Sequence, residues 1–173
     1  KLTKTINNKQ NNRPSLRKIP LIISENNPDQ LDLNELLFNF VNNDIKTHGK
    51  SNPKIKQYDI KILSNLSNNY SIMKLILQDK TLSQLLKDEY SKSSLTNDER
   101  LPLAIIFKNS TKNGLKPHQY FIPIIFSKLL KDPIKNFDNN GKIIIKTEVE
   151  SVINIMKNKI LFGNLIKKNI VTN

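Results

Sequence analysis

The chain has 173 residues and carries 28 Lys and Arg against 15 Asp and Glu, which gives a formal net charge of +13 and an isoelectric point near 9.8. A surplus of this sign predicts an anionic partner. The chain contains no cysteine, which excludes disulfides, thiolate zinc sites and a cysteine nucleophile. Lys or Asn interrupts every apolar stretch before the roughly 18 residues that a spanning helix needs, so we expect no integral membrane insertion.

The first 28 residues are predicted to be a basic, Asn-rich tail that does not pack by itself. They include Arg13, Arg17 and Lys18, and no acidic residue precedes Glu25. Few acids are typical of mitochondrial targeting segments. Because residue 1 is not Met, we expect a processed form or a fragment of a longer chain. Residues 29–173 are predicted to form one helical domain.

A helical hairpin is predicted at the start of this domain. Its first helix ends at Gly49, and Pro53 can open a second helix that contains Tyr58 and Asp59. Helical spacing predicts that one face of the first helix is buried. This face consists of Leu33, Leu36, Leu37, Phe40, Val41 and Ile45.

Two further helices are predicted before residue 91. Apolar residues within 72–77 form one helical patch, and Thr81 is a good N-cap for a helix that continues to Tyr90.

The next helix has two predicted starting points. Thr96 and Glu99 have the spacing of a capping box, which places the start at Asn97, whereas Pro102 favours a start nearer Leu101.

A second helix, turn and helix pattern occupies residues 103–131. The first helix is predicted to bury Leu103, Ile106, Phe107 and Ser110 and to stop at Gly114. Pro117 opens the second helix, in which Pro123 lies within the first two turns and removes few backbone hydrogen bonds.

The C-terminal part is predicted to contain a loop and one more helix. Residues 132–146 are interpreted as a loop inserted in the third hairpin. Within this range, residues 143–145 can instead be a strand or part of a helix, and of these two we favour the helix. The helix that follows is predicted to bury Val149, Ile153, Met156 and Ile160. A basic run at the end of this helix contains Lys157, Lys159, Lys167 and Lys168. We interpret it as a core helix with a solvated face rather than as a helix that lies on a membrane surface.

No catalytic, metal or cofactor motif can be assembled from this sequence. The two histidines, His48 and His118, each lie at a turn and far apart in the chain. A P-loop, a Gly-rich dinucleotide loop, paired carboxylates and a Ser/His/Asp signature are all missing from the sequence. We therefore expect a protein that is not an enzyme and that needs neither a metal nor a cofactor.

The two hairpin junctions resemble pentatricopeptide repeats of the fungal mitochondrial type. The likeness is carried by the spacing of Leu103, Phe107, Ser110, Gly114 and Pro117, with His118 in place of the common Asp. A looser copy is formed by Gly49, Pro53 and Tyr58, with Lys54 in place of the Asp. The resemblance implies an all-α fold, a short α-solenoid of about three hairpins with a repeat of thirty-odd residues.

The same resemblance implies binding of single-stranded RNA, with one base read by each repeat. The base-discriminating positions of the family correspond to Lys54, Asp59, His118 and Pro123. Because Pro123 has no polar side chain, we expect RNA binding dominated by the phosphate backbone, through Lys side chains and the two basic ends.

The expected setting is mitochondrial gene expression in the matrix. The short chain favours a subunit of the mitochondrial ribosome, or a ribosome-associated factor, in contact with rRNA or mRNA and with neighbouring ribonucleoprotein subunits. Two alternatives stay open, a helical-repeat scaffold that binds proteins and a non-catalytic subunit of an RNA-processing complex.

Overall fold

The structure is a computed structural model that describes residues 32–49, 51–112, 115, 121–132, 134, 137–158 and 163. Within these residues it contains α-helices and no strand, which confirms the all-α prediction. The chain divides into two units, Lys1–Gln30 and Leu31–Asn173, and all described residues belong to the second. The helices are α1 (Leu33–Thr47), α2 (Pro53–Leu66), α3 (Tyr70–Gln78), α4 (Lys80–Ser91), α5 (Asn97–Ser110), α6 (Phe121–Lys131) and α7 (Asn139–Lys157).

Side-chain caps fix the beginnings of most helices. The predicted start of α2 is confirmed: the Asn52 side chain accepts from the amides of residues 54 and 55, and Pro53 occupies the first turn. The capping box of Thr96 and Glu99 is also confirmed. Helix α5 therefore begins at Asn97, with Pro102 inside it, and the alternative start near Leu101 is wrong.

We expect Thr96→Ala to lower the free energy of unfolding by about 1 kcal/mol, because the Glu99 amide loses its hydroxyl acceptor at the start of α5. Urea denaturation monitored by circular dichroism measures this change. Ser91→Ala removes a hydroxyl that bonds the Lys87 carbonyl within α4 and caps no helix, so it serves as the control. Equal losses for the two variants would contradict the capping argument.

Helix α4 begins earlier than predicted. Asp79, not Thr81, is its N-cap, and its carboxylate accepts from the Leu82 amide at 2.9 Å. Asp79 also closes the C-terminus of α3, so one residue joins the two short helices. It further accepts from Asn42 and Lys46 of α1. The two carboxylate oxygens of Asp79 accept more hydrogen bonds at this junction than the single hydroxyl of a threonine could.

The predicted loop at 132–146 is too long. Helix α7 begins at Asn139, where the Asp138 carboxylate accepts from the Gly141 amide at 2.7 Å. Residues 143–145 are therefore helical rather than a strand. The sequence Asn-Asn-Gly suggested a turn, but an N-cap directly before it starts a helix instead.

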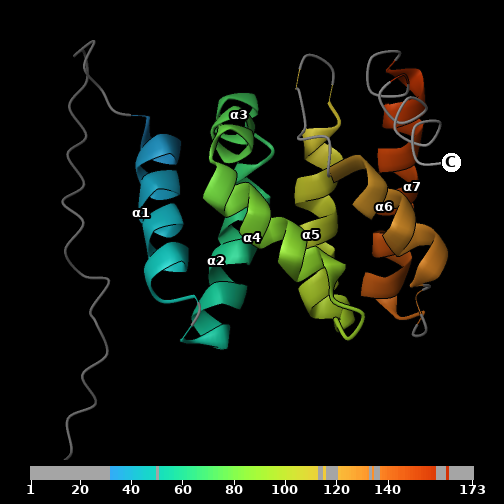
Figure 1. Cartoon of the computed structure of the whole chain (residues 1–173), viewed down its shortest axis with the longest axis horizontal. Coiled ribbons are helices and arrows are strands. Elements are labelled where there is room, and N and C mark those ends of the chain that lie inside the picture. The colour runs from blue at the N-terminus through green and yellow to red at the C-terminus, as the bar shows by residue number, and fades with distance from the viewer. Residues whose placement is uncertain are drawn as a thin grey trace, which may run out of the picture. The chain divides into compact units, whose positions relative to one another are not determined.

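Helices α2, α5 and α7 lie side by side in one layer (Figure 1). Their N-terminal ends are joined by hydrogen bonds from Gln57 to Glu99 and from Asn97 to Asp138, and their C-terminal ends by bonds such as that from Asn154 to Thr111. Helices α2, α5 and α7 are therefore parallel. Helix α1 reaches α2 through a short turn and packs antiparallel on its other side, while α3, α4 and α6 pack against this layer.

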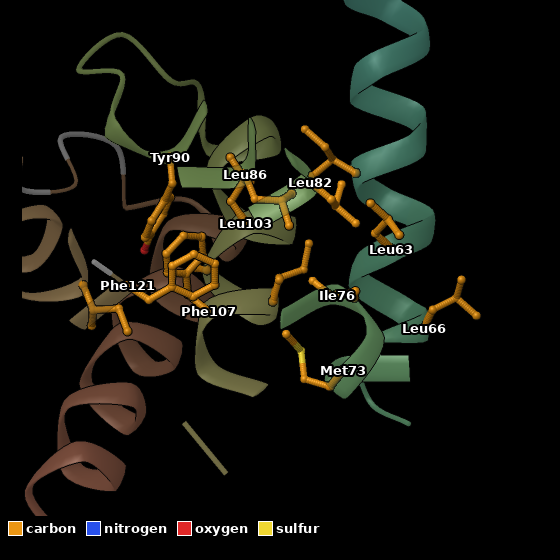
Figure 2. Close-up of a cluster of buried hydrophobic side chains, with 14 of the residues drawn as sticks. Leu63, Leu66, Met73, Ile76, Leu82, Leu86, Tyr90, Leu103, Phe107 and Phe121 are labelled. Atoms are coloured by element: carbon orange, nitrogen blue, oxygen red, sulfur yellow. The ribbon is translucent and has the colours of Figure 1, made fainter. Parts of the chain in front are cut away.

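The hydrophobic core lies between the layer of α1, α2, α5 and α7 and the helices that pack against it, α3, α4 and α6 (Figure 2). Tyr90 of α4, Phe107 of α5 and Phe121 of α6 form an aromatic column, with ring centroids 4.6 Å and 4.4 Å apart. Leu103, Ile106, Phe107 and Ser110 are all buried, as predicted for this helix. The predicted end at Gly114 lies outside the described residues, and α5 itself ends at Ser110.

Several contacts between α2, α5 and α7 recur with a nearly constant sequence separation. Asn109 of α5 donates to the C-cap hydroxyl of α2, Ser67, and Asn154 of α7 donates to the C-cap hydroxyl of α5, Thr111. These two pairs are 42 and 43 residues apart. The contacts at the N-terminal ends and that of Lys108 with Glu150 span 41 or 42 residues.

Parts of two faces that were predicted to be buried point to solvent instead. On α1, Val41 and Ile45 are buried together with Phe38, whereas Leu33, Leu36, Leu37 and Phe40, the α1 stripe, are exposed. On α7, Val149, Ile153 and Met156, the α7 stripe, are exposed as well. The opposite face of α7 is buried and includes Ile144, Thr147, Glu148, Ser151 and Ile155.

None of the described helices is both long enough and apolar enough to cross a bilayer.

Candidate nucleic-acid interface

Most of the predicted RNA-binding residues lie outside the described part of the chain. These are Arg13, Arg17, Lys18, His118, Lys159, Lys167 and Lys168. The described residues among the predicted set are Lys54, Asp59, Pro123 and Lys157, and their positions can be compared.

Lys54 and Lys157 are exposed but far from each other. Lys54 lies in the first turn of α2 and Lys157 ends α7. Because these helices are parallel and α5 lies between them, the two ammonium groups sit at opposite ends of the layer. The structure therefore does not bring them together as one contact site.

Asp59 is buried in α2 with 5% of its surface exposed, so its carboxylate is not offered to a base edge. One of its oxygens is buried without a hydrogen-bond partner. Burial, reinforced by the negative charge of Asp44 and opposed by His48, raises the pKa of Asp59 to about 6. The predicted role of Asp59 in base recognition does not fit this position.

Pro123 is half-buried in the first turn of α6, where the missing N–H costs no helical hydrogen bond. Its ring offers no polar group for reading a base. Backbone-directed binding at this position stays a prediction.

Many cations of the helical domain are already paired with carboxylates. Lys46 binds Asp79, Lys108 lies 3.4 Å from Glu150, and Lys128 lies 2.6 Å from Asp132. Glu89 bridges Lys56 and Lys92 at 2.7 Å each. Although burial alone would raise it, these two ammonium groups hold the pKa of Glu89 below its usual range.

The positive charge is consequently distributed unevenly. The described residues contain 16 Lys and Arg against 13 Asp and Glu, a surplus of three. The other residues contain 12 Lys and Arg but only Glu25 and Asp29, a surplus of ten. The described helices are thus nearly neutral, and most of the basic surplus belongs to the two ends and the segments at 50, 116 and 135.

A groove of about 400 Å³ opens between α2, the end of α4 and the start of α5. Its walls carry charges of both signs, with Lys56, Lys61 and Lys92 beside acidic residues. The acidic residues are Glu89, Asp98 and Glu99. Mixed charge of this kind gives little attraction for a phosphate backbone.

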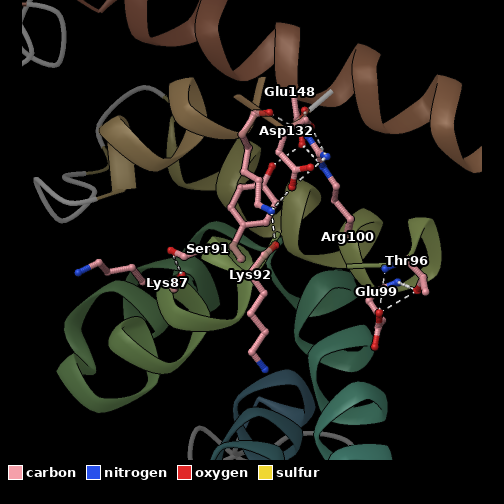
Figure 3. A network of polar contacts seen from close by, with 10 residues as sticks. Lys87, Ser91, Lys92, Thr96, Glu99, Arg100, Asp132 and Glu148 are labelled. Carbon is pink, nitrogen blue, oxygen red and sulfur yellow. Dashed lines mark hydrogen bonds and ion pairs between the residues drawn. The ribbon is translucent and has the colours of Figure 1, made fainter. Parts of the chain in front are cut away.

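A buried ionic network is the feature that the sequence analysis missed (Figure 3). Arg100 of α5 meets Glu148 of α7 through two hydrogen bonds, Nε to Oε1 at 2.8 Å and Nη2 to Oε2 at 2.9 Å. Arg100 also donates to the carbonyls of Lys128 and Asp132, and the Tyr90 hydroxyl donates to Glu148 at 2.6 Å. The network joins α4, α5, α6 and α7.

The pKa values in this network follow from burial and the paired charges. Burial, together with the Glu148 carboxylate, raises the pKa of Tyr90 well above its usual range. Burial opposes the charge of Arg100, but Glu148 outweighs it and raises the pKa of Arg100. Tyr90 therefore stays a neutral donor and Arg100 a permanent cation.

One signal in the sequence could have pointed to Arg100. The chain has 25 Lys and only three Arg, and Arg100 is the single arginine among the described residues. A guanidinium suits a two-pronged contact with a carboxylate, which an ammonium cannot make.

No group of three or more His, Cys, Asp or Glu within the described residues is arranged to hold a metal ion. Compared with known proteins, the chain matches no family model, no curated protein and no solved structure.

Proposed function

We propose that this protein binds single-stranded RNA mainly through its basic ends, with the described helices as a nearly neutral scaffold. The observation that carries the proposal is the uneven charge: the two ends, residues 1–31 and 159–173, hold nine Lys and Arg against Glu25 and Asp29, a surplus of seven, whereas the described residues hold a surplus of three. Phosphate contacts by Lys and Arg supply most of the affinity of proteins that bind RNA without reading its sequence. The buried position of Asp59 supports binding of this kind over one-base-per-repeat recognition.

The scaffold is proposed to be a short helical-repeat array. Support comes from the recurring contacts of α2, α5 and α7, whose partners are 41 to 43 residues apart. Repeats of the HEAT and armadillo type have about this length, whereas the pentatricopeptide repeat that the sequence resembles is shorter. The spacing favours the longer repeat. Membership of the pentatricopeptide family is thus the weaker part of the proposal.

The biological setting is proposed to be the mitochondrial matrix, in a ribosome subunit or a ribosome-associated factor. The acid-poor N-terminal residues and the resemblance of the two junctions support it. The contrasting function is a scaffold that binds other proteins, which the exposed apolar stripes of α1 and α7 favour. Nuclease treatment of the purified complex separates the two, because it releases partners held through RNA and leaves direct protein partners bound.

The RNA-binding proposal predicts steep salt dependence. Filter binding of the full chain to a labelled single-stranded RNA, titrated at several ionic strengths, measures the slope of log affinity against log salt. Each phosphate contact contributes about −0.7 to that slope. The RNA function fails if the chain binds no better at low salt than a neutral helical protein of similar size.

A pair of charge-matched variants tests the role of the ends. Replacing Arg13, Arg17 and Lys18 by Ala is expected to flatten the slope by about 2, three contacts at about 0.7 each. The control replaces three exposed helical lysines, Lys61, Lys80 and Lys131, and changes net charge equally. A comparable loss in both variants would show that total charge, not the N-terminal end, governs binding.

A further inference from the structure

Two helices at opposite edges of the main layer present apolar stripes to solvent. Helix α1 packs mainly on α2 and α3, and α7 packs mainly on α5 and α6. Phe40 of the α1 stripe is 63% exposed and Met156 of the α7 stripe is 58% exposed. Contiguous apolar stripes here indicate contact with another surface.

The charges around the two stripes are opposite in sign. Asp44 follows Phe40 by one turn on the outer face of α1, and Asp32 and Glu35 lie at the other end of that helix. The one basic residue within α1, Lys46, is bound to Asp79. The rim of the α1 stripe is therefore acidic.

Helix α7 shows the reverse pattern. Lys142 and Lys146 precede Val149 by two turns and one turn on the same exposed face, and exposed Lys157 follows Met156. Glu150 is the acidic residue nearest to this face, and it pairs with Lys108 of α5. The rim of the α7 stripe is therefore basic.

We propose that the α7 stripe of one molecule packs against the α1 stripe of a second copy. The stripes have equal length, since Leu33 to Phe40 and Val149 to Met156 are eight residues each, about 10 Å of helix from first to last. With the two helices antiparallel, Leu33 faces Met156 and Phe40 faces Val149. Asp44 then faces Lys146, and the N-terminal acids of α1 face Lys157.

This contact has a defined consequence for assembly. It joins unlike surfaces, so each bound copy keeps one free stripe, and the arrangement adds a further copy rather than closing as a symmetric dimer. It needs no RNA and is independent of the proposed RNA binding. The apolar faces supply the attraction, and the two charged rims fix the antiparallel orientation.

Sedimentation equilibrium of the nuclease-treated full chain tests the proposal. The weight-average mass of the unmodified chain is expected to exceed the 20.0 kDa of one molecule and to rise with concentration. Phe40→Glu and Ile153→Glu each place a carboxylate in one stripe, and each variant is expected to stay at 20.0 kDa. Tyr58→Glu changes an exposed aromatic residue of α2 outside both stripes and is expected to associate like the unmodified chain.

Mixing the two stripe variants gives the decisive result. Phe40→Glu keeps an intact α7 stripe and Ile153→Glu keeps an intact α1 stripe, so an equimolar mixture is expected to form one heterodimer of twice the monomer mass and nothing larger. The proposal is overturned if the unmodified chain stays monomeric, if either single variant still associates, or if the mixture stays monomeric. A single variant that still associates would indicate contact between like stripes instead. Circular dichroism confirms that the variants are folded.

Discussion

Glu148→Gln is expected to lower the free energy of unfolding by about 3–5 kcal/mol. The substitution preserves the shape of the side chain but leaves the Arg100 guanidinium buried beside a neutral amide, after both 2.8–2.9 Å charged contacts are lost. Removing one partner of a buried ion pair is costly because the remaining charge loses most of its compensation; Arg100 would keep only the longer contact with Asp132, at 3.7 Å. Urea denaturation at neutral pH, followed by circular dichroism, measures the loss.

The pair of Lys108 and Glu150 provides a matched control between the same two helices. Its atoms are 3.4 Å apart and both side chains are partly exposed, at 30% and 39%. Glu150→Gln is therefore expected to cost at most about 1 kcal/mol. If Glu148→Gln proved no more costly than Glu150→Gln, the buried network would not be holding α5 and α7 together.

The double replacement Arg100→Met with Glu148→Met separates two roles of the network. Replacing a whole buried ion pair by apolar side chains of similar volume is often neutral, whereas removing one partner is not. The double variant is thus expected to be more stable than Glu148→Gln alone. If it is less stable, the contacts of Arg100 with the carbonyls of Lys128 and Asp132 contribute more than the pair itself.

Local signals in the sequence were sufficient to predict where several helices begin. The capping box at Thr96 and the Pro53 start of α2 depend on neighbouring residues alone, so they could be read without knowing the rest of the fold. Asp79 was overlooked because Thr81 carries the same capping signal two residues later. Asp79 prevails because it also receives Asn42 and Lys46 from α1, which are distant in sequence.

The buried face of α7 could not be predicted from apolar spacing. This helix has apolar residues on several faces, and spacing alone favoured Val149, Ile153 and Met156. The buried face instead contains Thr147, Glu148 and Ser151, because Arg100 draws Glu148 inward. The partner of Glu148 lies 48 residues away in the chain, so local spacing could not reveal this ion pair.

The candidate interface was predictable in composition but not in arrangement. The sequence shows that both ends are basic. It does not show which cations of the described helices are paired with carboxylates, since Lys56 and Lys92 meet Glu89 only after α2 and α4 pack together. Nor does it show that Asp59 faces the interior, because its spacing fits a polar face equally well.

Asp59→Asn is expected to stabilise the protein near neutral pH, the opposite of the usual effect of changing a buried residue. The pKa of Asp59 is about 6 in the folded chain, against an ordinary value of 3.8. The folded state therefore holds the proton more tightly than the unfolded state, and stability falls as the pH rises from about 4 to 6. Above that range the chain carries a buried charge, and one oxygen has no hydrogen-bond partner.

The size of the effect follows from the pKa difference. About two pKa units correspond to about 3 kcal/mol. The free energy of unfolding of Asp59→Asn, relative to that of the unmodified chain, should therefore be higher at pH 7.5 than at pH 4 by up to that amount. Urea denaturation of both proteins at the two pH values measures the difference. Asp88→Asn, at an exposed carboxylate of α4, is the control.

The sign of the pH-dependent stability difference shows whether the Asp59 carboxylate is buried without a cation or paired with one. A carboxylate stabilised by a cation has a lowered pKa, and its removal would destabilise the protein more at pH 7.5 than at pH 4. Asp59 is instead surrounded by Asp44, which raises its pKa, and by His48, which lowers it less than burial raises it. A loss of stability for Asp59→Asn that grows with pH would mean that this carboxylate has a cationic partner, such as an ammonium group from one of the basic ends.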